Sequence, residues 1–162
     1  MLSELNNIFQ NGAAKFGCFT IDADPFLNTH ISRNWFGAIH FFEHLLASNA
    51  FVTAFGDVQP YKTPEVALDW EWSSSYVLGG DLASVLMLGG AYKNFKGSSE
   101  EAMELGRQFT FDLFGNRYED VGVFKCYQAW SSWFHNIAWD TTWMGVDKKD
   151  LTAWIIFCTD AD

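Results

Sequence analysis

The clearest helical pattern in the chain lies between Ser98 and Phe114. Apolar residues recur there every three or four positions, which places them on one face of a helix: Ala102, Leu105, Phe109 and Leu113. Ser98 and Glu101 have the spacing of a capping box, and Gly115 suits the position just beyond a helix end. These signals predict a helix from Ser98 to about Phe114.

Two further helices are predicted in the first third of the chain. Residues 2–14 have a modest helical pattern that ends near Gly17, followed by a short strand or loop, FTIDADP, closed by Pro25. Residues 31–47 form the next predicted helix, with one continuous apolar face made of Trp35, Ile39, Phe42 and Leu46. Thr63-Pro64-Glu65 is typical of the start of a further, short helix.

The pattern of the remaining segments favours strands. In WEWSSSYVL (residues 70–78) the side chains alternate, which predicts a strand, and Gly79-Gly80-Asp81 predicts a turn. LASVLML then fits the hairpin partner of this strand, and a buried helix over 82–92 is the alternative. From residue 121 onward, three runs rich in Val, Ile, Phe, Trp and Thr are separated by short polar segments: 121–130, 134–145 and 151–159. Short separations of this kind predict an antiparallel meander.

The last of these runs has apolar residues on both faces, so we expect it to be a central strand covered by helices. The predicted fold is therefore α+β, a mainly antiparallel sheet with a C-terminal three-stranded meander and helices packed on it. With 162 residues and no linker or repeat, the chain is expected to form one globular domain over 1–162.

Composition narrows the class of partner. The net charge is −10, from 20 acidic and 10 basic side chains, so nucleic acid and anionic membranes are disfavoured partners and a basic protein is favoured. The chain is rich in aromatic residues, with 16 Phe, 8 Trp and 5 Tyr, and exposed rings of this kind often anchor protein interfaces. Three cysteines far apart, Cys18, Cys126 and Cys158, indicate free, buried thiols. No signal peptide is evident, so we expect a cytoplasmic protein.

The sharpest catalytic signal is the pentapeptide HFFEH, residues 40–44. It resembles the H-x-x-E-H motif of the inverzincin zinc hydrolases. That resemblance implies His40 and His44 as zinc ligands and Glu43 as the catalytic general base. It covers the pentapeptide alone, because the chain is too short for the fold of that family and no third ligand is evident.

Other candidate sites are less specific. His135 lies among tryptophans in the second predicted strand, where it fits a buried histidine or the polar tip of an aromatic pocket with Trp139 and Trp143. The carboxylate pairs Asp22/Asp24 and Asp160/Asp162 fit solvated turns and an acidic tail, because neither has an EF-hand frame.

These carboxylates suggest an acidic rim around the aromatic meander. The predicted partner-binding residues are two tryptophans and six acids: Trp139, Trp143, Glu119, Asp120, Asp147, Asp150, Asp160 and Asp162. The favoured hypothesis is a non-catalytic acidic interaction protein without a cofactor, in concrete form a bacterial immunity protein that neutralises a basic toxin. The alternative is a zinc-dependent hydrolase that uses the HFFEH motif.

Overall fold

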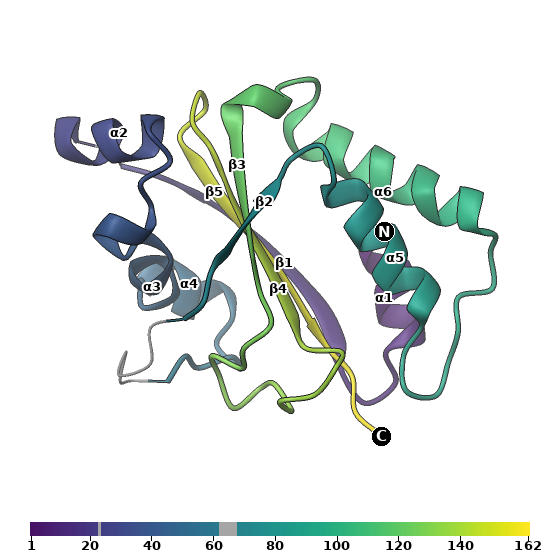
Figure 1. Ribbon diagram of the computed structural model, residues 1–162. Coiled ribbons are helices and arrows are strands. Elements are labelled where there is room, and N and C mark those ends of the chain that lie inside the picture. The colour runs from purple at the N-terminus through teal and green to yellow at the C-terminus, as the bar shows by residue number, and fades with distance from the viewer. Residues whose placement is uncertain (23, 62–67) are drawn as a thin grey trace.

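One antiparallel sheet forms the centre of this α+β fold (Figure 1). The computed structural model describes residues 1–22, 24–61 and 68–162. Within these residues the strand order is β1-β5-β4-β3-β2, and every neighbouring pair is antiparallel. The strands are β1 (Ala13–Thr20), β2 (Glu71–Ser74), β3 (Val121–Cys126), β4 (Thr141–Asp147) and β5 (Thr152–Thr159).

Helices cover both faces of the sheet. One layer contains α1 (Leu2–Ile8), α5 (Leu78–Leu88) and α6 (Ser99–Phe114), and the opposite layer contains α2 (Pro25–Ser32), α3 (Phe41–Leu46) and α4 (Asn49–Ala54) (Figure 1). Two short 3-10 helices, Gly37–Ile39 and Tyr118–Asp120, complete the described elements. Within the described ranges, no helix combines the length and apolar character needed to cross a membrane.

Each face of the sheet has its own hydrophobic core. Successive residues of β5 point to opposite faces, so Trp154 and Ile156 pack with α1, α5 and α6, whereas Ile155 and Phe157 pack with α2–α4. All four side chains are at most 1% exposed. This confirms the predicted central strand that is apolar on both faces.

The C-terminal meander is confirmed, but its first two strands are shorter than the predicted runs 121–130 and 134–145. The chain between Cys126 and Thr141 is a loop. Local turns stabilise it, and in one of them the Phe134 N–H donates a hydrogen bond to the Ser131 carbonyl at 3.2 Å. In this loop Trp130 donates a hydrogen bond from Nε1 to Thr142 Oγ1 at 2.9 Å. Trp130 and Phe134 of the loop therefore fill the core without belonging to a strand.

The predicted N-terminal helix over 2–14 is wrong in its second half. α1 ends at Ile8, and Ala13–Thr20 form β1, which pairs with β5 along its whole length. A Cβ on Gly12 would lie 2.0 Å from the Thr159 carbonyl oxygen, so a glycine is needed for the chain to enter this strand. Pairing with a distant strand overrides the local helical pattern.

The predicted continuous helix over 31–47 is also wrong. α2 ends at Ser32 and α3 begins only at Phe41, because Asn34 and His40 have left-handed backbone conformations with φ of 56° and 48°. The bends place Phe36 and Phe42 on the sheet, where both rings contact Phe124. Trp35, predicted to lie on the apolar face, is 50% exposed.

The segment after β2 follows the alternative prediction. Residues 78–88 form α5, so the predicted hairpin partner is wrong and a helix is present as in the alternative, although it covers 78–88 and not 82–92. Gly79 lies inside this helix and contacts Gly106 of α6, where a Cβ on Gly106 would be 2.1 Å from the Gly79 carbonyl oxygen. Two small residues allow the helix backbones to touch, a requirement that a local turn pattern does not reveal.

The predicted helix after Ser98 is confirmed in detail. Ser98 is the N-cap, both hydrogen bonds of the capping box with Glu101 are formed, and Gly115 is the C-cap with φ of 60°. The helix start predicted at Thr63-Pro64-Glu65 lies outside the described residues.

Candidate functional site

The HFFEH motif spans a helix start rather than the middle of a helix. His40 is the N-cap of α3 in a left-handed conformation, and its carbonyl accepts the His44 N–H at 3.0 Å. Both histidines are exposed and Glu43 is half-buried. Among residues 1–22, 24–61 and 68–162, no group of three or more His, Cys, Asp and Glu side chains is placed to hold a metal ion.

The predicted acidic rim is divided between two ends of the sheet. Asp147 and Asp150 lie at the turn between β4 and β5, whereas Asp160 and Asp162 follow the far end of β5. β5 has eight residues, so about 25 Å of extended chain separates the two groups. The six carboxylates therefore do not form one surface.

At the first end, basic side chains offset the carboxylates. Arg117 bonds to both Asp147 and Asp150, the latter at 2.6 Å. Asp147 is buried, and its Oδ1 also accepts the backbone N–H groups of Lys149 and Asp150 at 3.0 Å. The Lys148 N–H donates to the Asp120 carbonyl at 2.9 Å, which brings Glu119 and Asp120 next to this turn and its lysines.

At the other end Asp160 is a structural residue. It is 0% exposed, and its carboxylate accepts the backbone N–H of Asn11 at 2.8 Å and that of Ala91 at 2.7 Å. It thus links the start of β1 and the segment after α5 to the end of β5. Asp162 alone of this pair is exposed.

The two predicted aromatic anchors belong to the core rather than to the surface. Trp143 is 0% exposed and packs between the sheet and α5. Trp139 is half-buried, and its Nε1 donates to the Gly89 carbonyl at 3.1 Å. His135 is exposed in the 127–140 loop, so the predicted aromatic pocket with these tryptophans is not formed.

Two of the three thiols are buried. Burial raises the pKa of the Cys158 thiol to about 12, and Cys126 is also buried. Cys18, by contrast, is exposed on β1, which corrects the expectation of a buried thiol.

A different acidic surface lies at the β2 edge of the sheet. We call it the acidic–aromatic edge, and it consists of three carboxylates and two exposed rings: Glu43, Asp69, Glu71, Trp72 and Tyr127. Trp72 is 58% exposed and Tyr127 is 53% exposed.

Contacts between neighbouring elements bring these residues together. Glu71 and Trp72 belong to β2, where they pair with Lys125 and Phe124 of β3, and Tyr127 directly follows β3. The Asp69 N–H donates to Gln128 Oε1 at 2.9 Å. On the α3 side, the rings of Phe42 and Trp70 lie 4.8 Å apart, which holds α3 beside the start of β2.

The three carboxylates of this edge act electrostatically on the Cys126 thiol. Burial is the largest cause of the raised pKa of the Cys126 thiol, and the negative charges of Asp69, Glu71 and Glu43 raise it further. Within the part of the chain that the structure describes, none of these three carboxylates forms an ion pair. The Lys125 ammonium bonds to Asp81 at 3.2 Å and lies 4.9 Å from the centre of the Tyr127 ring.

Sequence reasoning missed this edge except for Glu43, which it assigned to catalysis. The sequence feature that could have indicated this edge is the tetrapeptide Asp69-Trp70-Glu71-Trp72, in which acidic and aromatic residues alternate. In a strand such alternation places the two kinds of side chain on opposite faces. One partner can contact both faces of a strand only where that strand lies at an edge of the sheet. Which strand lies at an edge depends on the strand order, and the strand order is set by the tertiary structure.

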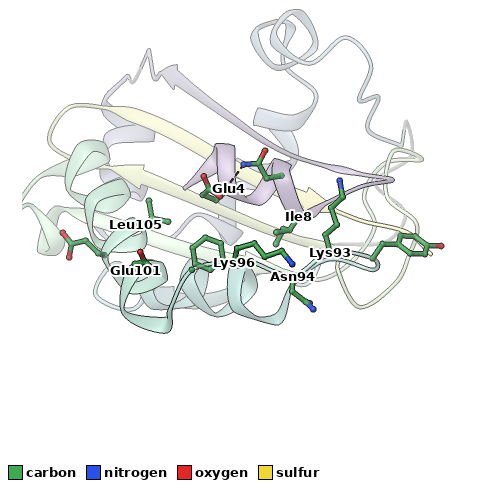
Figure 2. Close-up of a pocket in the computed structure, with 12 residues that line it drawn as sticks. Glu4, Ile8, Lys93, Asn94, Lys96, Glu101 and Leu105 are labelled. Carbon is green, nitrogen blue, oxygen red and sulfur yellow. Dashed lines mark hydrogen bonds between the residues drawn. The ribbon is translucent and has the colours of Figure 1, made fainter.

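A separate cavity of about 740 Å³ lies between α1, residues 92–97 and α6. Figure 2 shows Lys93 and Lys96 reaching from the 92–97 segment, with Glu101 and Leu105 on α6. The Glu101 carboxylate accepts the Ser98 N–H at 2.6 Å, whereas the two lysines have no ion pair within the described ranges. No predicted site residue lines this cavity.

The fold and these surfaces define an α+β protein with an acidic, aromatic sheet edge. The sequence matches no model of a known protein family and no curated protein, and the fold matches no solved structure.

Proposed function

We propose that this chain is a non-catalytic acidic protein that binds a basic protein partner. The observation that carries the proposal is the acidic–aromatic edge, where two exposed rings stand beside three carboxylates without ion pairs among the described residues. Aromatic residues often supply much of the binding energy of an interface, and unpaired charges steer a partner of opposite sign.

The position of the edge supports this role. β2 has only four residues, so the rim of the sheet is short and its side chains, rather than a long row of backbone groups, meet a partner. Trp72 contacts Phe124 edge-to-face at 4.9 Å, which holds the indole in place before a partner arrives. A preorganised ring loses less conformational entropy on binding.

In its concrete form, the proposal is an immunity protein that neutralises a basic toxin such as a nuclease. Immunity proteins and their toxins are encoded together, so the probe is the basic protein encoded by the neighbouring gene. Carboxylates at the edge would occupy the cationic cleft that otherwise binds phosphate. If the neighbouring genes encode no basic protein, the immunity form of the proposal is wrong.

Binding of this probe is measured by calorimetry at low and high salt. A Glu43→Gln, Asp69→Asn, Glu71→Gln variant is expected to weaken binding by at least tenfold and to flatten its salt dependence. Trp72→Ala is expected to cost about 2 kcal/mol of binding free energy, as a central aromatic anchor does. The matched control is Glu119→Gln with Asp150→Asn, at the end where basic residues offset the acids.

The two sets of variants separate the two acidic surfaces. If the control variant loses affinity and the edge variant does not, the partner binds at the predicted rim and our assignment of the edge is wrong. If neither variant changes a salt-sensitive affinity, electrostatic recognition through both surfaces is excluded.

A further inference from the structure

The opposite edge of the sheet, β1, has an open stretch of backbone. β1 is the outermost strand in the described order, and the groups of alternate residues point toward β5 or away from it. Hydrogen bonds show the direction of these backbone groups at two positions. Ala14 bonds outward to the Asn6 side chain, with N–H to Oδ1 and carbonyl to Nδ2 both at 2.9 Å, and Ile21 N–H bonds inward to the Leu151 carbonyl at 2.7 Å.

It follows that Phe16, Cys18 and Thr20 also point their N–H and carbonyl groups outward. The Asn6 side chain forms hydrogen bonds with both outward groups of Ala14. Within the described residues, the outward groups of the other three have no hydrogen-bond partner. Cys18 and Thr20 are exposed side chains as well. An open strand edge of this kind is a template for another strand.

We propose that this edge pairs with the same edge of a second copy of the chain, antiparallel and centred on Cys18. The open residues are symmetric about that position, since Phe16 of one copy lies opposite Thr20 of the other and Cys18 lies opposite itself. Such self-complementarity is what a two-fold interface requires. The pairing forms about six main-chain hydrogen bonds and one sheet continuous through both copies.

Charge favours a second copy over a basic partner strand. Residues 16–21, FGCFTI, carry no charge, so this stretch offers nothing to a cationic peptide although the whole chain has a net charge of −10. Lys15 is the one charged residue of β1. Its ammonium already bonds to Asp57 at 2.5 Å, so it is offset within its own chain.

The interface is tested by sedimentation velocity on the full chain, from micromolar to submillimolar concentration. Cys18→Pro removes an outward N–H and leaves the bonds to β5 intact, and the preceding Gly17 tolerates a proline after it. Cys18→Ser is the matched control, because it keeps the N–H. We expect wild type and Cys18→Ser to dimerise with rising concentration, and Cys18→Pro to dimerise at least about thirtyfold more weakly.

Salt and amide exchange give readouts that do not depend on the proline variant folding. High salt is expected to strengthen the dimer, because it screens the repulsion between two chains of like net charge. In wild type, the Phe16, Cys18 and Thr20 amides become protected from exchange as concentration rises, whereas the Ala14 amide is protected throughout. A monomer at every concentration, a dimer unaffected by Cys18→Pro, or a dimer with these amides unprotected would overturn the proposal.

Discussion

Replacing Asp160 by Asn is expected to destabilise the fold severely although the change is nearly isosteric. The carboxylate is 0% exposed, and its two oxygens accept the N–H groups of Asn11 and Ala91. Hydrogen bonds to a charged acceptor contribute about 1.5–3 kcal/mol each. An amide can accept only one of these N–H groups and turns its own NH₂ toward the other, which leaves a buried donor without an acceptor.

The lost bond and the unsatisfied donor together cost about 2–4 kcal/mol of unfolding free energy. For a chain of 162 residues, that corresponds to a fall in Tm of roughly 5–15 °C. Urea denaturation followed by tryptophan fluorescence measures the effect as a lower midpoint with an unchanged slope.

Asp162→Asn is the matched control, because the same substitution two residues later affects an exposed carboxylate. Its effect is expected to stay within about 0.5 kcal/mol. If the two variants have equal stability, the two backbone hydrogen bonds do not stabilise the fold and the structural role of Asp160 is wrong.

Two further predictions concern helix packing and metal binding. Gly106→Ala places a Cβ 2.1 Å from the Gly79 carbonyl oxygen, and the overpacking is expected to cost about 1–3 kcal/mol. Gly80→Ala is the control, since its Cβ meets nothing within 4 Å and is expected to stabilise the helix by about 0.5–1 kcal/mol in the same denaturation assay. Metal analysis of the purified chain is expected to find no stoichiometric zinc, with the same Tm before and after chelator. Zinc that is bound by wild type and lost in His40→Ala would support the hydrolase alternative against the non-catalytic proposal.

Local signals predicted those elements whose stabilising contacts lie within the element itself. The helix after Ser98 was predicted from its capping box and apolar stripe, because the Ser98 and Glu101 hydrogen bonds form between residues three apart. β5 was recognised as central because both of its faces are apolar. The helix over 2–14 failed because the pairing of Ala13–Thr20 with β5 joins residues more than 130 positions apart.

The candidate site was less accessible to sequence reasoning than the fold. Glu43, Asp69 and Glu71 all act on the Cys126 thiol only because α3, the start of β2 and the end of β3 converge at one edge. Whether a carboxylate is buried also depends on distant partners. Asp160 and Asp162 look alike in the sequence, yet only Asp160 meets Asn11 and Ala91.

By itself, the sequence determined the α+β class, the C-terminal meander, the acidic charge and the capped helix, because periodicity, composition and short-range hydrogen bonding depend on neighbouring residues. Only the tertiary structure decided which strands lie at the edges of the sheet and which acids face solvent. Strand order assigned Glu71 and Trp72 to one edge and Cys18 to the other. Burial then moved Trp143 and Asp160 from the predicted interface into the interior, because a side chain without exposed surface contacts its own fold and not a partner.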